Sequence, residues 1–343
     1  MKNIIITGGS GFIGSNLVNY LINKRFFVIN IDKLSYSSNK FSEKKRNNKN
    51  YKFVKLDINN KKKLFKIIKK YKPKAIFNLA AETHVDRSID GPKPFIDTNI
   101  NGTFNLLECI RALNKIMKIK LIHISTDEVY GDIKGRKRSH ENDKYHPSSP
   151  YSASKASADH LVSSYVRTYK INAVISNCCN NYGPYQFPEK LIPLMIINAL
   201  NNKSLPVYGK GDNVRDWLYV LDHCDAIYTV LERGEIGQTY NVGGNNEIKN
   251  IDVIETICDI LDHLIPKGNS ESYKKLIHFV QDRPGHDFRY AIDASKLNSK
   301  LGWSPKESFE SGLKKTIQWY INNKNWWTAI LDNTYRQERL GVV

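Results

Sequence analysis

The sequence has no long run of apolar residues. Its first apolar stretch, residues 4–6, is followed at once by Thr7 and Gly8. No stretch approaches the roughly 20 apolar residues that a membrane span requires, and this first one is far shorter than the apolar centre of a secretion signal. The sequence therefore predicts a cytoplasmic protein with no membrane segment.

Cysteine is also scarce in this chain. The 343 residues include only Cys109, Cys178, Cys179, Cys224 and Cys258. Their odd number excludes complete pairing in disulfides, and no two of them have the Cys-x-x-Cys spacing of redox and zinc motifs. We expect buried free thiols in a reducing compartment, and no metal site.

Acidic residues are few relative to basic ones. Lys and Arg number 52 against 34 Asp and Glu, giving a formal net charge of +18. The excess is spread over residues 42–50, 59–70 and 134–139 instead of forming one stripe, and many asparagines lie between. This distribution indicates solvated loops and helix faces, and it favours acidic small substrates such as nucleotide sugars over nucleic acid.

The first half of the chain alternates between apolar strands and helices. We predict strands at 3–7, 26–32, 51–57, 73–80, 120–125 and 171–177, and helices at 12–24, 60–71, 93–117 and 152–169. Strands that are apolar throughout and alternate with helices predict an α/β protein, with a Rossmann-type doubly wound parallel sheet covered on both faces.

The alternation changes near residue 180, where residues 180–193 carry three prolines and a glycine. A helix at 194–201 and a strand at 206–208 follow, with irregular charged segments between them. We predict two domains: 1–180 with returning segments at about 214–245, and a smaller mixed α/β substrate domain made mainly of 181–343.

A glycine-rich motif, ITGGSGFIG, joins the first strand to the first helix at residues 6–14. The dinucleotide pattern G-x-G-x-x-G is satisfied by Gly9, Gly11 and Gly14, and the spacing of Gly8 suits it too. Helix N–H groups would then face the pyrophosphate. Asp32 ends the second strand, where an acid can hold the ribose hydroxyls, so NAD is favoured over NADP.

The segment YSASK places Tyr151 and Lys155 four residues apart at the start of a helix. Residues with this spacing share a helix face. An ammonium there lowers the cost of ionising the phenol, whose ordinary pKa is about 10. The phenolate could take a proton from a secondary alcohol as hydride leaves for a nicotinamide.

These motifs, with STDEVYG at 125–131, resemble the extended short-chain dehydrogenase/reductase family. Within it, AAETHVDRSI (80–89), NCCNNYGPYQFPEKLIPLMI (177–196), PVYGKGDNVRDWLYVLDH (206–223) and DRPGHDFRYAID (282–293) resemble nucleoside-diphosphate-glucose 4,6-dehydratases. The resemblance covers nearly the whole chain. It implies a lyase that removes water from dTDP- or UDP-glucose and feeds deoxysugar synthesis, such as that of rhamnose.

The resemblance also gives roles to the acids of STDEVYG. Oxidation at C4 of the hexose makes a ketone that acidifies the C5–H. Glu128 is the expected base at C5, and Asp127 the expected acid that expels the C6 hydroxyl, before hydride returns to C6. Two adjacent carboxyl groups in a closed pocket resist ionising together, which suits one acid and one base. Thr126 is expected to bind the 4-hydroxyl and Tyr151.

Further site residues follow from the resemblance by position. The expected NAD contacts are Gly8, Gly11, Phe12, Ile13, Gly14, Asp32, Lys33, Leu34, Ser35, Asp57, Ile58, Leu79, Ala80, Ala81, Thr83, Thr98, Tyr151, Lys155 and Asn181. The expected substrate contacts are Thr83, Thr126, Asn180, Lys190, Leu191, Pro206, Tyr208, Arg215, Asn250, Arg283 and His286. Both arginines suit a diphosphate because a planar guanidinium binds phosphate oxygens in pairs.

Other functions stay open at this point. A nucleotide-sugar 4-epimerase or decarboxylase of the same family is one alternative, although the Asp127–Glu128 pair disfavours an epimerase. A non-catalytic dinucleotide-binding or nucleic-acid-binding protein is another. The resemblance also implies a homodimer, and the residues do not decide between thymidine and uridine nucleotides.

Overall fold

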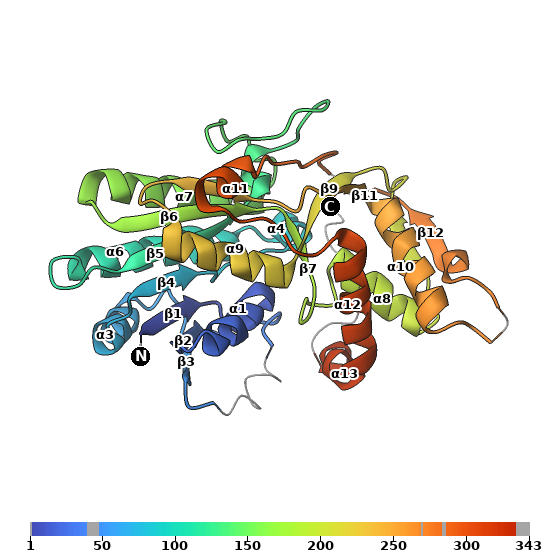
Figure 1. The fold of residues 1–343 in the computed structure, drawn as a ribbon, viewed down its shortest axis with the longest axis horizontal. Helices are drawn as coiled ribbons and strands as arrows, with labels where there is room; N and C mark the ends of the chain where they lie inside the picture. The colour runs from blue at the N-terminus through green and yellow to red at the C-terminus, as the bar shows by residue number, and fades with distance from the viewer. Residues whose placement is uncertain (1, 40–47, 269, 283–285, 334–343) are drawn as a thin grey trace.

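The computed structural model describes residues 2–39, 48–268, 270–282 and 286–333, and at its centre lies a seven-stranded parallel sheet (Figure 1). The strands are β1 (Asn3–Thr7), β2 (Phe27–Asp32), β3 (Tyr51–Lys55), β4 (Ala75–Asn78), β5 (Lys120–Thr126), β6 (Asn172–Cys178) and β10 (Thr239–Val242). Their order is β10-β6-β5-β4-β1-β2-β3. The order reverses between β1 and β4, which confirms the predicted doubly wound sheet and places a crevice at the carboxyl ends of these strands.

Helices cover both faces of this sheet because successive strand residues point to opposite sides. Ile4 and Ile6 of β1 are buried with α1 (Phe12–Asn23), α9 (Val220–Arg233) and α11 (Ser295–Leu301), while Ile5 is buried with α3 (Lys61–Tyr71), α6 (Thr103–Leu113) and α7 (Pro150–Tyr169). The short α4 (Val85–Asp90) and α5 (Lys93–Phe95) and the π-helical η1 (Ile96–Gly102) precede α6. None of the helices in the described ranges combines the length and apolar character of a membrane span.

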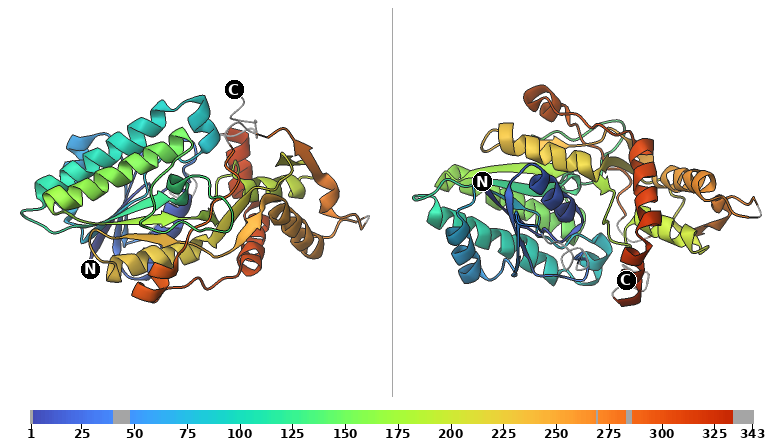
Figure 2. Two further views of the ribbon diagram at one scale, coloured as in Figure 1. Left: turned by 90° about the horizontal axis from the view of Figure 1, so that it is seen from above. Right: turned by 60° about the horizontal axis from the view of Figure 1, so that its bottom comes forward.

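A second, smaller part lies beyond one end of the sheet (Figures 1 and 2). It contains a three-stranded sheet of β7 (Asn180–Tyr182), β9 (Val214–Tyr219) and β11 (Glu247–Lys249), and the pair β8 (Leu205–Tyr208) and β12 (Ile277–Val280). Around these strands pack α8 (Leu191–Leu200), α10 (Asn250–Leu264), α12 (Phe309–Asn322) and α13 (Lys324–Asn333), with the 3₁₀ turn η3 (Tyr273–Leu276). Their apolar side chains form a core of their own.

The predicted strands and helices of the first half match the observed ones within a few residues at their ends. One difference is that the expected helix 93–117 consists of α5, the π-helical η1 and α6. Beyond residue 180, α9, β10 and α11 lie with the large sheet, whereas β9 pairs with β7 and β11. The proposed division into 1–180 plus 214–245 and 181–343 stays a prediction.

Candidate active site

A pocket lies at the carboxyl ends of the central strands, where most of the predicted site residues come together. It is lined by the predicted residues Gly8, Gly11, Phe12, Ile13, Gly14, Asp32, Lys33, Ser35, Asp57, Ile58, Leu79, Ala80, Ala81, Thr83, Thr98, Thr126, Asp127, Glu128, Tyr151, Lys155, Asn180, Asn181 and Lys190. The NAD contacts and the reactive residues expected from the sequence thus share one cavity. Leu34 is the one predicted NAD contact that does not line it.

The glycine-rich turn has the shape that a dinucleotide requires. Gly8 has φ +74°, and a Cβ there would lie 2.6 Å from the backbone nitrogen of Ala80. A Cβ on Gly14 would lie 2.1 Å from the carbonyl oxygen of Gly8, so only glycine allows this close packing. Helix α1 begins after Gly11 with no side-chain cap and no acid in its first turn, which leaves its N-terminus suited to an anion.

The carboxylate of Asp32 is buried at the end of β2. It accepts hydrogen bonds from the backbone nitrogens of Ser10 (3.0 Å) and Leu34 (2.7 Å), and from the Ser38 hydroxyl (3.2 Å). Burial raises the pKa of Asp32, and these hydrogen bonds oppose that rise. The arrangement fixes an acceptor at the position where dinucleotide folds hold a ribose.

Lys33, which could have attracted a 2′-phosphate, is engaged elsewhere. Its Nζ lies 2.8 Å from Glu82 Oε1 and donates to Thr98 Oγ1 at 3.2 Å. Since Glu82 neutralises this ammonium, the pocket beside Asp32 suits NAD better than NADP.

The two adjacent acids after β5 have different environments. Thr126 caps the 3₁₀ turn η2 (Asp127–Tyr130) by accepting from the backbone nitrogen of Glu128 at 3.3 Å, and its hydroxyl donates to Asp127 Oδ1 at 3.3 Å. Asp127 is 3% exposed, whereas Glu128 is half-buried. The turn therefore places the carboxyl group of Asp127 in an enclosed position and that of Glu128 in a more open one.

Burial and neighbouring charges favour the neutral form of Asp127. Burial raises the pKa of Asp127 well above its usual value, Glu128 and Asp216 raise it further, and Arg215 opposes them. Its Oδ2 atom is buried and has no hydrogen-bond partner within the described parts of the chain. A protonated carboxyl with an uncommitted oxygen at the pocket wall is suited to donate a proton to a ligand.

Helix α7 positions Tyr151 and Lys155. Ser149 and Ser152 form a capping box and Pro150 occupies the first turn, which fixes where the helix begins. Lys155 Nζ donates to the carbonyl oxygen of Ile124 at 2.6 Å.

Burial dominates the surroundings of the Tyr151 phenol. Burial raises the pKa of Tyr151 well above its ordinary value and the charge of Glu128 raises it further, while the hydrogen bond with Thr126 lowers it. Lys155 Nζ is directed at the carbonyl oxygen of Ile124, and its expected effect on the Tyr151 phenol stays a prediction.

Most predicted substrate contacts lie outside this pocket. Leu191, Pro206, Tyr208, Arg215, Asn250 and His286 do not line it, and Arg283 lies outside the described residues. Tyr208 and His286 pack edge to face with ring centres 6.5 Å apart, beside the β8–β12 pair. Their roles toward the substrate stay predictions.

Arg215 is committed to the backbone next to the site. Its guanidinium stacks on Tyr290 at 4.4 Å and donates to the carbonyl oxygens of Val214, Asp287 and Phe288 at 2.8–3.2 Å. These bonds hold segment 287–290 against β9 near the acids of the pocket. The expected pairing of Arg215 with a diphosphate stays a prediction.

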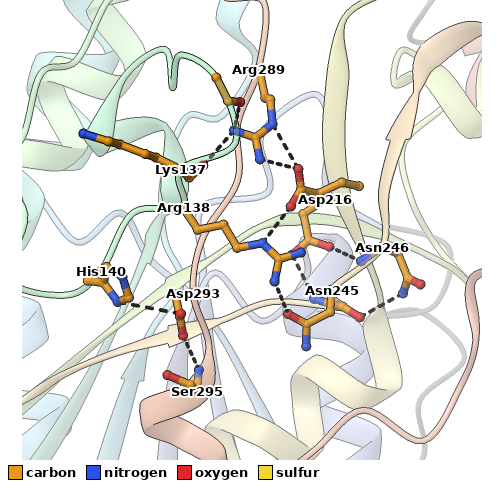
Figure 3. A network of polar contacts seen from close by, with 12 residues as sticks. Lys137, Arg138, His140, Asp216, Asn245, Asn246, Arg289, Asp293 and Ser295 are labelled. Carbon is orange, nitrogen blue, oxygen red and sulfur yellow. Dashed lines mark hydrogen bonds and ion pairs between the residues drawn. The ribbon is translucent and has the colours of Figure 1, made fainter.

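A polar network fixes Asp216, the second carboxylate that raises the pKa of Asp127 (Figure 3). Asp216 accepts from the backbone nitrogens of Gly244 (3.0 Å) and Asn246 (2.7 Å). Glu247, in the adjoining strand, accepts from both Arg138 and Arg289. Part of the basic segment 134–139, expected to be solvated, is therefore neutralised by an ion pair.

Several pocket residues were missed by sequence reasoning: Ile31, Ser37, Ser38, Leu56, Ile124, Ser125, Cys178, Cys179, Gln186, Phe187 and Glu189. Gln186, Phe187 and Glu189 lie within the four residues before Lys190, so proximity to a predicted contact was an available signal. Ser37 and Ser38 lie in an irregular loop after β2, and no pattern in the sequence marks them.

Comparisons with known proteins show which proteins this chain resembles. Residues 5–316 match the family described as GDP-mannose 4,6 dehydratase. The chain is 53% identical to dTDP-glucose 4,6-dehydratase of Neisseria meningitidis serogroup B over 100% of this chain and 99% of that protein. Crystal structures of two dTDP-glucose 4,6-dehydratases are similar in fold. The Bacillus anthracis enzyme in complex with NAD has a TM-score of 0.87, 46% identity, and coverage of 96% of this chain and 100% of that one. DesIV of Streptomyces venezuelae with NAD and TYD bound has a TM-score of 0.88, 39% identity, and coverage of 96% and 99%.

Proposed function

The chain belongs to the GDP-mannose 4,6 dehydratase family, and from this premise we propose that it converts dTDP-glucose to the 4-keto-6-deoxy sugar. It is an NAD-dependent dehydratase of nucleoside-diphosphate glucose, a lyase of the hydro-lyase type. The observation that carries this function is the Asp127–Glu128 pair. A buried acid whose surroundings raise its pKa and a more open neighbouring acid lie in one pocket with Tyr151 and the dinucleotide turn.

The cofactor is NAD, and the residues of the pocket fit it. The turn of Gly8, Gly11 and Gly14 with the uncapped N-terminus of α1 would hold the pyrophosphate, and Asp32 the adenosine ribose. When bound, NAD accepts a hydride from C4 of the hexose and later returns it to C6.

In the first step, we propose that Tyr151 takes the proton of the 4-hydroxyl, with Thr126 holding the same oxygen. Burial makes the phenol a poor acid by itself. The positive charge of Lys155, four residues away on the same helix face, favours the phenolate once the nicotinamide end of the pocket is filled.

In the second step, Glu128 is the proposed base that removes the C5 proton, which the C4 ketone has acidified. Asp127, kept neutral by its surroundings, is the proposed acid that protonates the departing C6 hydroxyl. Each such group contributes roughly 10²–10⁴ in rate. An epimerase needs neither group, so the pair disfavours a 4-epimerase.

We further propose that the protein is a cytoplasmic homodimer. Apolar side chains are exposed along the outer face of the η1–α6–α7 layer, where Ile96, Phe104 and Tyr169 are 41–42% exposed. Pairing through these helices would cover them. Light scattering at micromolar concentration tests this, and a monomer would contradict it.

Mass spectrometry of the products from dTDP-glucose, UDP-glucose and GDP-mannose tests the function. We expect loss of one water from dTDP-glucose at the highest kcat/KM. Release of carbon dioxide from UDP-glucuronate, or unchanged product mass with an inverted C4, would instead identify a decarboxylase or an epimerase.

A further inference from the structure

Two separate chain segments form adjoining walls of the pocket. The segment after β2, residues 33–39, contributes Lys33, Ser35, Ser37 and Ser38 to the lining. The segment before α8, residues 186–190, contributes Gln186, Phe187, Glu189 and Lys190. These two walls belong to different parts of the chain and are separated by about 150 residues of sequence.

The walls are joined directly by Tyr36. Its hydroxyl donates to Glu189 Oε1 at 2.8 Å, and its ring packs edge to face on Phe187 at 5.5 Å. Arg87 lies over the Tyr36 ring at 4.1 Å and donates to the same carboxylate at 3.1 Å. The side chain of Glu189 is 3% exposed, so its carboxylate accepts these bonds where little water can compete for it.

The walls are joined a second time by Trp326 of helix α13. Its indole Nε1 donates to Asn39 Oδ1 at 2.9 Å, and its ring packs edge to face on Tyr185 at 5.9 Å. Trp326 and Asn39 are each 4% exposed. One indole, contributed from near the end of the chain, therefore contacts both the end of the first wall and the residue preceding the second.

Asn39 links Trp326 to the glycine-rich dinucleotide turn. Its backbone nitrogen donates to the carbonyl oxygen of Ser10, whose own backbone nitrogen donates to Asp32. Ser38, the preceding residue, also donates to Asp32. Movement of Asn39 away from Trp326 would thus loosen the residues placed around the adenosine ribose.

The proposed reaction requires the dinucleotide to stay bound, and the contacts between the two pocket walls would help to hold it. The hydride removed from C4 returns to C6 of the same sugar, so the reduced cofactor must stay bound between the two transfers. A cofactor that escaped after the first transfer would leave the oxidised sugar without its reductant.

We propose that Trp326 is a positioning residue that closes a clasp, made of segments 33–39 and 186–190, over the bound dinucleotide and slows its escape during turnover. This inference rests on the proposed function only for the reason why NAD must stay bound during turnover. The clasp itself concerns retention of NAD and can be measured without any sugar.

The chain offers a matched control in the neighbouring residue. Trp327 is also buried, but its Nε1 donates to the carbonyl oxygen of Tyr320 within the same helical hairpin. Trp326→Phe and Trp327→Phe remove the same atoms at similar burial. Only Trp326→Phe breaks the bond to the pocket wall.

The test compares both variants as purified holoenzymes. We expect Trp326→Phe to release bound NAD about fivefold to tenfold faster than wild type in exchange with labelled NAD, as loss of one buried hydrogen bond implies. Trp327→Phe should release it at the wild-type rate. During turnover with dTDP-glucose and no added NAD, Trp326→Phe should shed NADH into an ultrafiltrate. Equal release rates for the two variants would overturn the proposal.

Asn39→Ala gives a second route if Trp326→Phe does not yield folded holoenzyme. This substitution removes Asn39 Oδ1, which accepts the hydrogen bond from Trp326, and should accelerate NAD release to a similar extent. In the double variant the two effects should not add, because they remove one interaction. Full additivity would overturn the clasp. If the variants release NAD faster but the wild-type protein dehydrates no sugar nucleotide, the clasp is supported and the proposed function is refuted. If the wild-type protein dehydrates dTDP-glucose but the variants release NAD at the wild-type rate, the proposed function is supported and the clasp is refuted.

Discussion

The hydroxyl of Ser125, on the strand that leads to Asp127 and Glu128, donates a 2.7 Å hydrogen bond to Asp159 on α7. This carboxylate lies one helical turn beyond Lys155, and His123 Nε2 approaches its other oxygen at 3.3 Å. Burial raises the pKa of the nearby Tyr145, and the charge of Asp159 raises it further. Sequence reasoning missed Asp159, although its four-residue spacing from Lys155 repeats that of the Tyr151–Lys155 pair.

The position of Asp159 near Lys155 predicts that Asp159→Asn changes the pH dependence of the reaction. Burial lowers the pKa of Lys155, and Asp159 opposes that decrease. Without the carboxylate the pKa of Lys155 falls further, so the ammonium is lost at lower pH. The alkaline limb of the pH profile for NADH formation should move to lower pH. Ser125→Ala, which keeps the carboxylate, should leave the limb in place, and an unmoved limb in Asp159→Asn would refute this role.

Replacing Glu128 by Gln should separate oxidation from elimination. Without a base at C5, the variant should accumulate NADH from dTDP-glucose but release product at least about 100-fold more slowly. It should also incorporate no solvent deuterium at C5. Absorbance at 340 nm and mass spectrometry measure the two outcomes. Tyr151→Phe is the comparison variant and should show no NADH signal, because oxidation itself fails.

Asp127→Asn should raise stability while abolishing dehydration. The folded-state pKa of Asp127 lies above its unfolded value, because burial disfavours the charge. The folded state therefore binds the proton of Asp127 more tightly than the unfolded chain does. As pH rises above the pKa that Asp127 has in the unfolded chain, Asp127 progressively lowers the free energy of unfolding. The Tm gain of Asp127→Asn should be largest near neutral pH and vanish below about pH 4. A Tm gain of the same size at every pH would contradict the argument.

Gly14→Ala should destabilise the protein by about 1–3 kcal/mol and weaken NAD binding, because the new methyl group meets the Gly8 carbonyl oxygen. Gly91 provides the control, since a Cβ there would meet no atom within 4 Å among the described residues. Urea unfolding of both variants gives the comparison. Equal free energies of unfolding would show that the turn can relax around a side chain.

Sequence patterns predicted the sheet, and they predicted that Tyr151 and Lys155 lie close together, because both features depend on local order. Apolar strands such as 120–125 and the spacing of Tyr151 and Lys155 can be seen in a short window. Contacts such as Asn39 with Trp326 join residues 287 positions apart, and no local pattern marks either partner. The direction of the Lys155 ammonium toward Ile124 likewise depends on how α7 packs on β5, which spacing alone does not determine.

Strand β10 has a consequence for biosynthesis. It pairs in parallel with β6 through Thr239–Val242, so the edge of the large sheet is covered only by residues made long after β6. While the ribosome adds the intervening residues, β6 presents unpaired backbone groups, the kind of edge that recruits other chains. Truncation of the gene near residue 180 would leave that edge open permanently, and such a fragment should precipitate instead of folding into a working nucleotide-binding unit.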